Sequence, residues 1–152
     1  METKRIASQL RRSYEGPAWH GPSLRELLQD VTFEQAAGKP VEGAHSVWEL
    51  VHHIEAWERQ ALTTLEGQTY VSLTGDTDWP PVPEITADAW KDAMERLKST
   101  TSKLVDAIRR MDDAKLDEMV AGKEFNCYFL LHGVVQHNLY HGGQIALLKK
   151  VG

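Results

Sequence analysis

The sequence is poor in cysteine, in positive charge and in long apolar runs, and each shortage excludes a class of protein. Its 152 residues include one cysteine, Cys127, which can form neither an internal disulfide nor a cysteine-based zinc cluster. The 17 Lys and Arg against 22 Asp and Glu give a net charge of −5, which disfavours binding to a nucleic-acid backbone. No segment approaches the roughly 18 consecutive apolar residues of a membrane span.

What remains is the composition of an ordinary globular protein. Hydrophobic residues make up 41% and charged residues 26%, and the length suits a single domain over residues 1–152. The first residues, METKRIASQLRRSYEG, lack the apolar segment of a secretory signal. We therefore expect a cytoplasmic protein that binds neither membrane nor nucleic acid. Seven histidines are present, and any metal site must be built mainly from histidine and carboxylate.

Hydrophobic periodicity predicts an all-α protein. Apolar residues recur at alternating spacings of four and three along residues 90–111, and a second such stripe runs along residues 126–150. Two further helical segments cover residues 46–67 and 6–31, the latter interrupted by GPAWHGP. The proline-rich stretch QTYVSLTGDTDWPPVPE is a long connection between the second and third helices. The pattern predicts a four-helix bundle with long inter-helix connections, in up-down-down-up or up-down-up-down order.

The starts of three helices carry recognisable caps. Ser46 and Glu49, and likewise Ser23 and Glu26, have the spacing of a capping box, in which each side chain bonds the other residue's backbone N–H. Thr86 has the residue type and the position of an N-cap for the third helix. These caps predict where the helices begin.

Three histidines are placed where two of these helices can face each other. On a helical wheel, His137 and His141 lie one turn apart at the centre of the apolar stripe of the last helix. His132 lies on the opposite side, where we expect it in solvent. In residues 46–67, His53 lies on the flank of the apolar face, whereas His52 is turned further away. We therefore expect His53, and not His52, to reach an interhelical site.

The spacing of these histidines matches a metal site. A pair at i and i+4 spans the bite of one metal ion, and a third histidine from a neighbouring helix leaves the fourth position open for water or substrate. The same spacing also fits buried histidines that bond other side chains. Burial favours the metal, because two imidazoles in an apolar core need partners. A zinc-protease mechanism is disfavoured, because Asn138 replaces the Glu base of H-E-x-x-H.

The sequence resembles the DinB-like family of four-helix-bundle proteins, which includes thiol-dependent S-transferases of Gram-positive bacteria. The resemblance rests on HSVWELVHHIEAWE at positions 45–58 and on HNLYHGGQIALL at positions 137–148, and it extends over nearly the whole chain. It implies that His53, His137 and His141 bind one divalent metal ion, zinc or nickel. It also favours a homodimer.

Five other residues have both a structural and a functional interpretation. Gln144 lies beside the ligand stripe, where it can support a ligand or bond a neighbouring helix. His20, in the Gly/Pro break, is a candidate acid–base group. Trp57 is expected to pack in the core or to wall the metal pocket. We expect Cys127 to be a small buried side chain rather than a nucleophile, and Glu58 to be a solvated surface residue rather than a general base.

Together these observations predict a metal-dependent enzyme with an open three-histidine site. A bound divalent metal lowers the pKa of a thiol, which suits transfer of a low-molecular-weight thiol to an electrophilic small molecule, the reaction that the resemblance favours. The same site with bound water could instead hydrolyse an amide or an ester. A third alternative is a non-enzymatic metal-binding bundle of the stress response. The lack of an evident carboxylate base favours thiol transfer over hydrolysis.

Overall fold

The computed structural model describes all 152 residues and consists of helices joined by loops. Four long helices form the bundle: α1 (Glu2–Glu15), α4 (Val47–Leu65), α5 (Ala87–Arg110) and α6 (Cys127–Val151). The shorter elements are α2 (Leu24–Leu28), α3 (Phe33–Ala37) and two 3₁₀ turns, Gly75–Thr77 and Asp113–Asp117. The prediction of an all-α helical bundle is confirmed, and the structure contains no β-strand.

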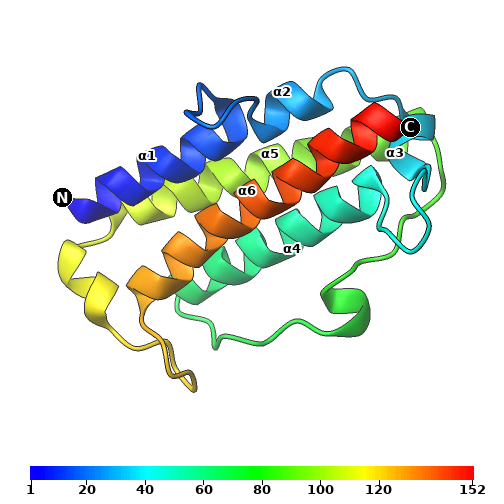
Figure 1. The fold of residues 1–152 in the computed structure, drawn as a ribbon. Helices are drawn as coiled ribbons and strands as arrows, with labels where there is room; N and C mark the ends of the chain where they lie inside the picture. Colours follow the sequence, from blue (N-terminus) through cyan, green and yellow to red (C-terminus); the bar gives the residue numbers. More distant parts are fainter.

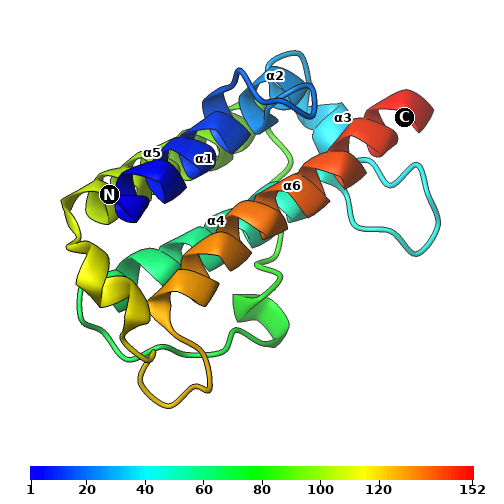
Figure 2. The same cartoon turned by 60° about the vertical axis from the view of Figure 1, so that its left-hand side comes forward.

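The four long helices run up-down-down-up around the core (Figure 1). α1 packs against α5 and α6, and α4 packs against the same two helices, so that α1 and α4 lie diagonally across the bundle. α4 and α5 are parallel, because residues 66–86 carry the chain back alongside α4 before α5 begins (Figures 1 and 2). None of the helices combines the length and the apolar character that a membrane crossing requires.

Side-chain caps start the helices where the sequence predicts them. Ser46 Oγ accepts a hydrogen bond from the Glu49 backbone N–H at 3.1 Å, and Glu49 Oε2 accepts from the Ser46 N–H at 2.7 Å. Ser23 and Glu26 form the same capping box at the start of α2, and Thr86 caps α5. Such a cap is worth about 1 kcal/mol, because it satisfies N–H groups that have no partner inside the helix.

The core consists of two hydrophobic clusters at opposite ends of the bundle. One cluster gathers the start of α4 and of α5 with the end of α6, and includes Trp48 and Leu97. The other gathers the start of α1 and of α6 with the end of α4 and of α5, and includes Leu10 and Leu131. The middle of the bundle, where the candidate site lies, therefore falls between two apolar regions.

A layer of buried polar side chains occupies this middle level, one from each long helix: Ser13, Glu58, Thr101 and Asn138. Glu58 accepts hydrogen bonds from Thr101 Oγ1 at 2.5 Å and from Asn138 Nδ2 at 2.7 Å. Glu58 is completely buried, which raises the pKa of its carboxyl group to about 7. The expectation that Glu58 is a solvated surface residue is wrong, because position 58 follows Ile54 by four residues and shares its buried face.

Candidate metal site

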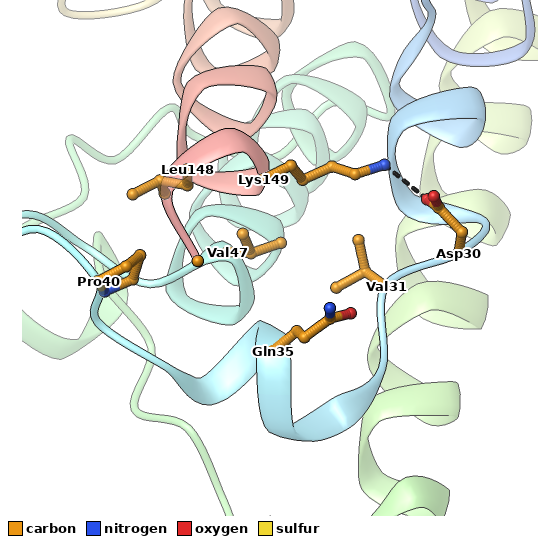
Figure 3. Close-up of a pocket in the computed structure, with 8 residues that line it drawn as sticks. Asp30, Val31, Gln35, Pro40, Val47, Leu148 and Lys149 are labelled. Atoms are coloured by element: carbon orange, nitrogen blue, oxygen red, sulfur yellow. Dashed lines mark hydrogen bonds and ion pairs between the residues drawn. The ribbon is translucent and has the colours of Figure 1, made fainter.

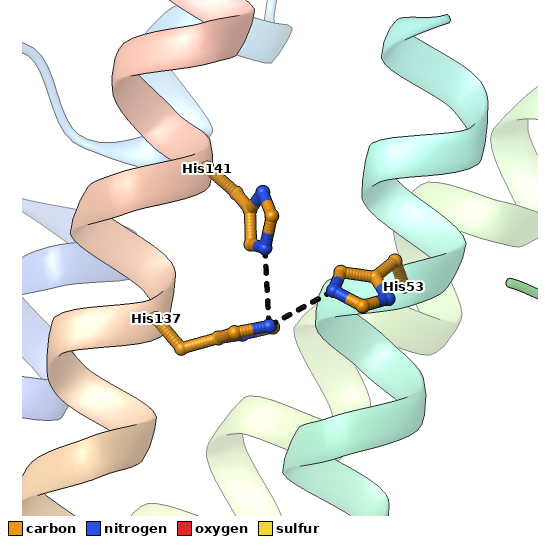
Figure 4. A group of neighbouring side chains, drawn as sticks. All are labelled: His53, His137 and His141. Atoms are coloured by element: carbon orange, nitrogen blue, oxygen red, sulfur yellow. Dashed lines mark hydrogen bonds between the residues drawn. The ribbon is translucent and has the colours of Figure 1, made fainter. Parts of the chain in front are cut away.

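His53 on α4 and His137 and His141 on α6 point toward one another in the space between these two helices (Figure 4). Nε2 of His137 lies 3.0 Å from Nε2 of His53 and 3.1 Å from Nε2 of His141. Two nitrogens that bind one zinc ion at about 2.0–2.1 Å in tetrahedral geometry lie roughly 3.3–3.4 Å apart, close to the distances found here. One ligand atom from each of the three lies within 4.8 Å of the others, so the group can hold one metal ion.

The outer ring nitrogens of two of these histidines face hydrogen-bond acceptors. Nδ1 of His53 lies 2.7 Å from the backbone oxygen of Asp78 and 3.2 Å from its Oδ1. Nδ1 of His141 lies 2.6 Å from Oε1 of Gln144. Because these oxygens only accept, each Nδ1 carries the proton, and each Nε2 presents a lone pair to the centre of the group. Hydrogen bonds of this kind fix the tautomer and the orientation of metal-binding histidines.

His137 supplies the third nitrogen. Its Nδ1 is buried without a hydrogen-bond partner, and its Nε2 faces the lone pairs of both neighbours. Burial and the two neighbouring histidines lower the pKa of His137 to about 3, and burial lowers the pKa of His53 and of His141. The rings are therefore neutral at neutral pH, as metal ligands must be. A proton on Nε2 of His137 cannot bond fully to the lone pairs of both His53 and His141 at once. The three convergent, neutral nitrogens therefore fit a divalent cation.

The connection of residues 66–86 covers one side of the site. Trp79 lies between two imidazole rings, stacked on His53 with ring centroids 3.8 Å apart and on His45 with centroids 3.4 Å apart. Oδ1 of Asp78 accepts a hydrogen bond from Nε1 of Trp57 at 2.7 Å. Asp78 thus joins a histidine and a tryptophan of α4, and Trp79 shields the face of the His53 ring.

Asp78 and Trp79 are the residues of this site that the sequence analysis does not identify. They lie in an irregular, proline-rich segment, where no periodicity gives a side chain a direction. The signal in the sequence is weak: an acidic residue and a tryptophan stand directly before two prolines in a long connection.

Two other histidines on these helices lie outside the group. His52 is buried, accepts a hydrogen bond from Trp48 Nε1 at 3.0 Å and lies with Nδ1 3.2 Å from the backbone oxygen of Pro80. The expectation that His132 lies in solvent is wrong: it is half-buried, its ring centroid is 4.3 Å from that of Tyr128, and its Nε2 is enclosed. A wheel gives a direction relative to one helix and does not show which neighbouring side chains cover that face.

The remaining candidates also lie apart from the three histidines. His20 is exposed between α1 and α2 and lines a hollow of about 350 Å³ to which none of the three histidines contributes. Cys127 is half-buried against the second hydrophobic cluster, and burial raises the pKa of its thiol. A further hollow lies at the end of α6, bordered by the ion pair of Asp30 and Lys149 (Figure 3). None of these places contains a group of the candidate metal site.

The protein is thus a helical bundle with a three-histidine group between two of its helices. A family model described as the DinB superfamily matches residues 18–145, a span that contains all three histidines. The chain belongs to the DinB superfamily. Searches of curated proteins and of solved structures found no match.

Proposed function

We propose that His53, His137 and His141 hold one divalent metal ion, zinc or nickel, and that the protein transfers a low-molecular-weight thiol to an electrophilic small molecule. The observation that carries the proposal is the convergence of three neutral Nε2 atoms. Two of these atoms present lone pairs because Asp78 and Gln144 accept the protons on the opposite side of the rings. Imidazole nitrogen is a suitable ligand for both metals.

The chemistry of the donor set favours a thiol as the reacting group. The three imidazoles carry no charge, so they do not offset the double charge of a metal ion and they favour an anionic further ligand. A divalent ion held there would lower the pKa of a bound thiol below its free value of about 8.5, which gives a thiolate at neutral pH. In the overall reaction the thiol sulfur bonds to an electrophilic carbon, the leaving group departs from that carbon, and the thiol proton passes to solvent.

The chain's own residues bind, orient and shield. Gln144 orients His141, while Asp78 orients His53 and Trp57 from outside the group of Nε2 atoms. Glu58 already accepts hydrogen bonds from two buried partners in the polar layer. Glu58 is completely buried and cannot reach solvent water, and Oδ1 of Asp78 is turned toward Trp57 and His53. No carboxylate oxygen therefore points into the group of Nε2 atoms as a base for water, which supports thiol transfer over hydrolysis.

The proposal is tested with purified protein loaded with zinc or nickel. Loaded protein is expected to accelerate conjugation of cysteine to 1-chloro-2,4-dinitrobenzene. The His141→Ala variant should lose both the metal and the acceleration, whereas His132→Ala, a control on the same helix, should keep both. Hydrolysis of amides or esters without thiol transfer would contradict the proposal and support the hydrolase alternative. Metal binding with neither activity would support a non-enzymatic metal-binding bundle.

A further inference from the structure

An apolar hollow of about 200 Å³ opens beside His137, between α4, α6 and two loops. Four aromatic side chains form most of its wall, from α4, from both loops and from the first turn of α6: Trp57, Tyr70, Phe125 and Phe129. Gly133, His137 and two aliphatic residues of α6 complete it, and no Asp, Glu, Lys or Arg contributes. We call this hollow the aromatic pocket. An apolar cavity of about 150 Å³ is large enough to bind benzene, so the aromatic pocket can accept a ring.

We propose that the aromatic pocket binds a planar, uncharged aromatic group of the electrophilic small molecule. The role of that molecule as the electrophile rests on the proposed function. Binding of the aromatic group itself depends only on the lining of the pocket and can be measured without metal or turnover.

The lining favours a flat, neutral group. The ring centroid of Phe125 lies 5.7 Å from that of Tyr70 and 5.5 Å from that of Phe129. The three rings therefore form a continuous aromatic wall. Burial raises the pKa of Tyr70, which keeps its phenol neutral. Lys123 lies over the Tyr70 ring at 5.1 Å and donates a hydrogen bond to Ser72, outside the lining. An ionised ligand would lose its hydration in this pocket without gaining a partner.

The aromatic pocket and the candidate metal site share a wall. His137 lines the pocket and also belongs to the three-histidine group. Trp57, whose ring centroid is 6.2 Å from that of His137, is hydrogen-bonded to Asp78, which in turn contacts His53. A ligand ring seated in the pocket would therefore lie directly beside the group that is proposed to activate the thiol.

The side chain of Phe129 supports a binding role for this surface. It is 65% exposed although its neighbours in the pocket are apolar. A large aromatic side chain left in solvent beside an apolar hollow gains buried area when a ligand ring fills that hollow.

Gly133 offers a matched pair of variants. A Cβ at Gly133 would meet no atom within 4 Å, so a methyl group can be added there without displacing a neighbour. Gly133→Leu places a branched side chain in the pocket, whereas Gly133→Ala adds one methyl group. Both replacements remove the same unfavourable glycine from the interior of α6, and neither changes a histidine.

The test follows binding of 4-fluorobenzyl alcohol by fluorine NMR in the intact protein. Wild type and Gly133→Ala are expected to bind the alcohol. Gly133→Leu is expected to bind it at least about tenfold more weakly, because the leucine side chain occupies the space that the ligand ring needs. 4-Fluorobenzoate, the charged counterpart, should bind wild type about tenfold more weakly than the alcohol. Metal content should be equal in all three proteins.

Equal binding to wild type and Gly133→Leu, no binding to wild type, or tighter binding of 4-fluorobenzoate would each overturn the proposal. These outcomes can be distinguished from a failure of the proposed function. In that case the protein would bind no metal or transfer no thiol, but 4-fluorobenzyl alcohol would still bind in the aromatic pocket. With transferase activity present, Gly133→Leu should lower kcat/KM for 1-chloro-2,4-dinitrobenzene and spare iodoacetamide, which has no ring. An equal loss for both electrophiles would also overturn the proposal.

Discussion

The buried carboxyl group of Glu58 is expected to make the stability of the bundle depend on pH. Its pKa rises from about 4.5 to about 7 on folding, chiefly because burial penalises the charged form. The folded protein therefore binds this proton more tightly than the unfolded chain. The stabilisation is fully present below the unfolded pKa of about 4.5 and is lost as the pH rises through about 7.

The size of the effect follows from the shift in pKa. One unit corresponds to about 1.4 kcal/mol, so a change from 4.5 to about 7 corresponds to about 3 kcal/mol in the free energy of unfolding. The charge of Glu55 adds to the rise in the pKa of Glu58. Burial and the charge of Glu58 in turn raise the pKa of Tyr14 to about 12, so its phenol stays neutral over the pH range of the assay. Glu58→Gln keeps the shape and abolishes the charge. Its amide oxygen can accept from Asn138 Nδ2, and its amide nitrogen can donate to Thr101 Oγ1, whose own proton then goes to the backbone oxygen of Leu97.

The assay is urea unfolding of wild type and Glu58→Gln, followed by circular dichroism across the pH range. Near pH 8 the variant should be more stable by up to about 3 kcal/mol, and near pH 4.5 the two proteins should be about equal. Glu66→Gln, at the exposed end of α4, is the control and should not change the pH profile. A difference between wild type and Glu58→Gln that is constant across the pH range would show that Glu58 does not titrate with a raised pKa in the folded protein, as would a variant that is less stable near pH 8.

Three further substitutions test the supports of the site and of the fold. Gln144→Leu removes the acceptor for His141 Nδ1 and should weaken zinc binding by about tenfold in a calorimetric titration; unchanged affinity would show that Gln144 does not position the ligand. Ser46→Ala removes the α4 cap and should lower the melting temperature by about 3 °C, whereas no change would mean that water replaces the cap. His52→Ala breaks contacts with Trp48 and Pro80 and should lower the free energy of unfolding by about 1–3 kcal/mol without altering metal stoichiometry; metal loss would assign His52 to the site.

The helices of this bundle can be predicted from the sequence because their signals are local. Ser46 and Glu49 lie within one turn, and the apolar spacings of α5 repeat along a single segment. The polar layer cannot be predicted in this way, because Glu58 acquires its partners from α5 and α6, far away in the chain. A charged residue type suggests a surface position, and only the packed structure shows the hydrogen bonds that allow burial.

The candidate site, too, can be predicted only in part from the sequence. The positions of His137 and His141 on one face follow from their spacing, and the direction of His53 follows from the wheel of α4. Asp78 lies in a loop, and its contact with His53 depends on how that loop packs against α4. The aromatic pocket combines Tyr70 from one loop with side chains of another loop and of two helices, so it exists only once the chain has folded.

Titration of zinc or nickel into metal-free protein, followed by calorimetry, measures whether His53, His137 and His141 form a metal site. Wild type and His132→Ala should each bind one ion per chain. His53→Ala, His137→Ala and His141→Ala should each lose most of the affinity, because each removes one of three ligands. Circular dichroism of each variant shows whether the helices remain. Absence of binding to wild type, or full affinity in a folded His137→Ala variant, would contradict the claim that these three histidines form a metal site.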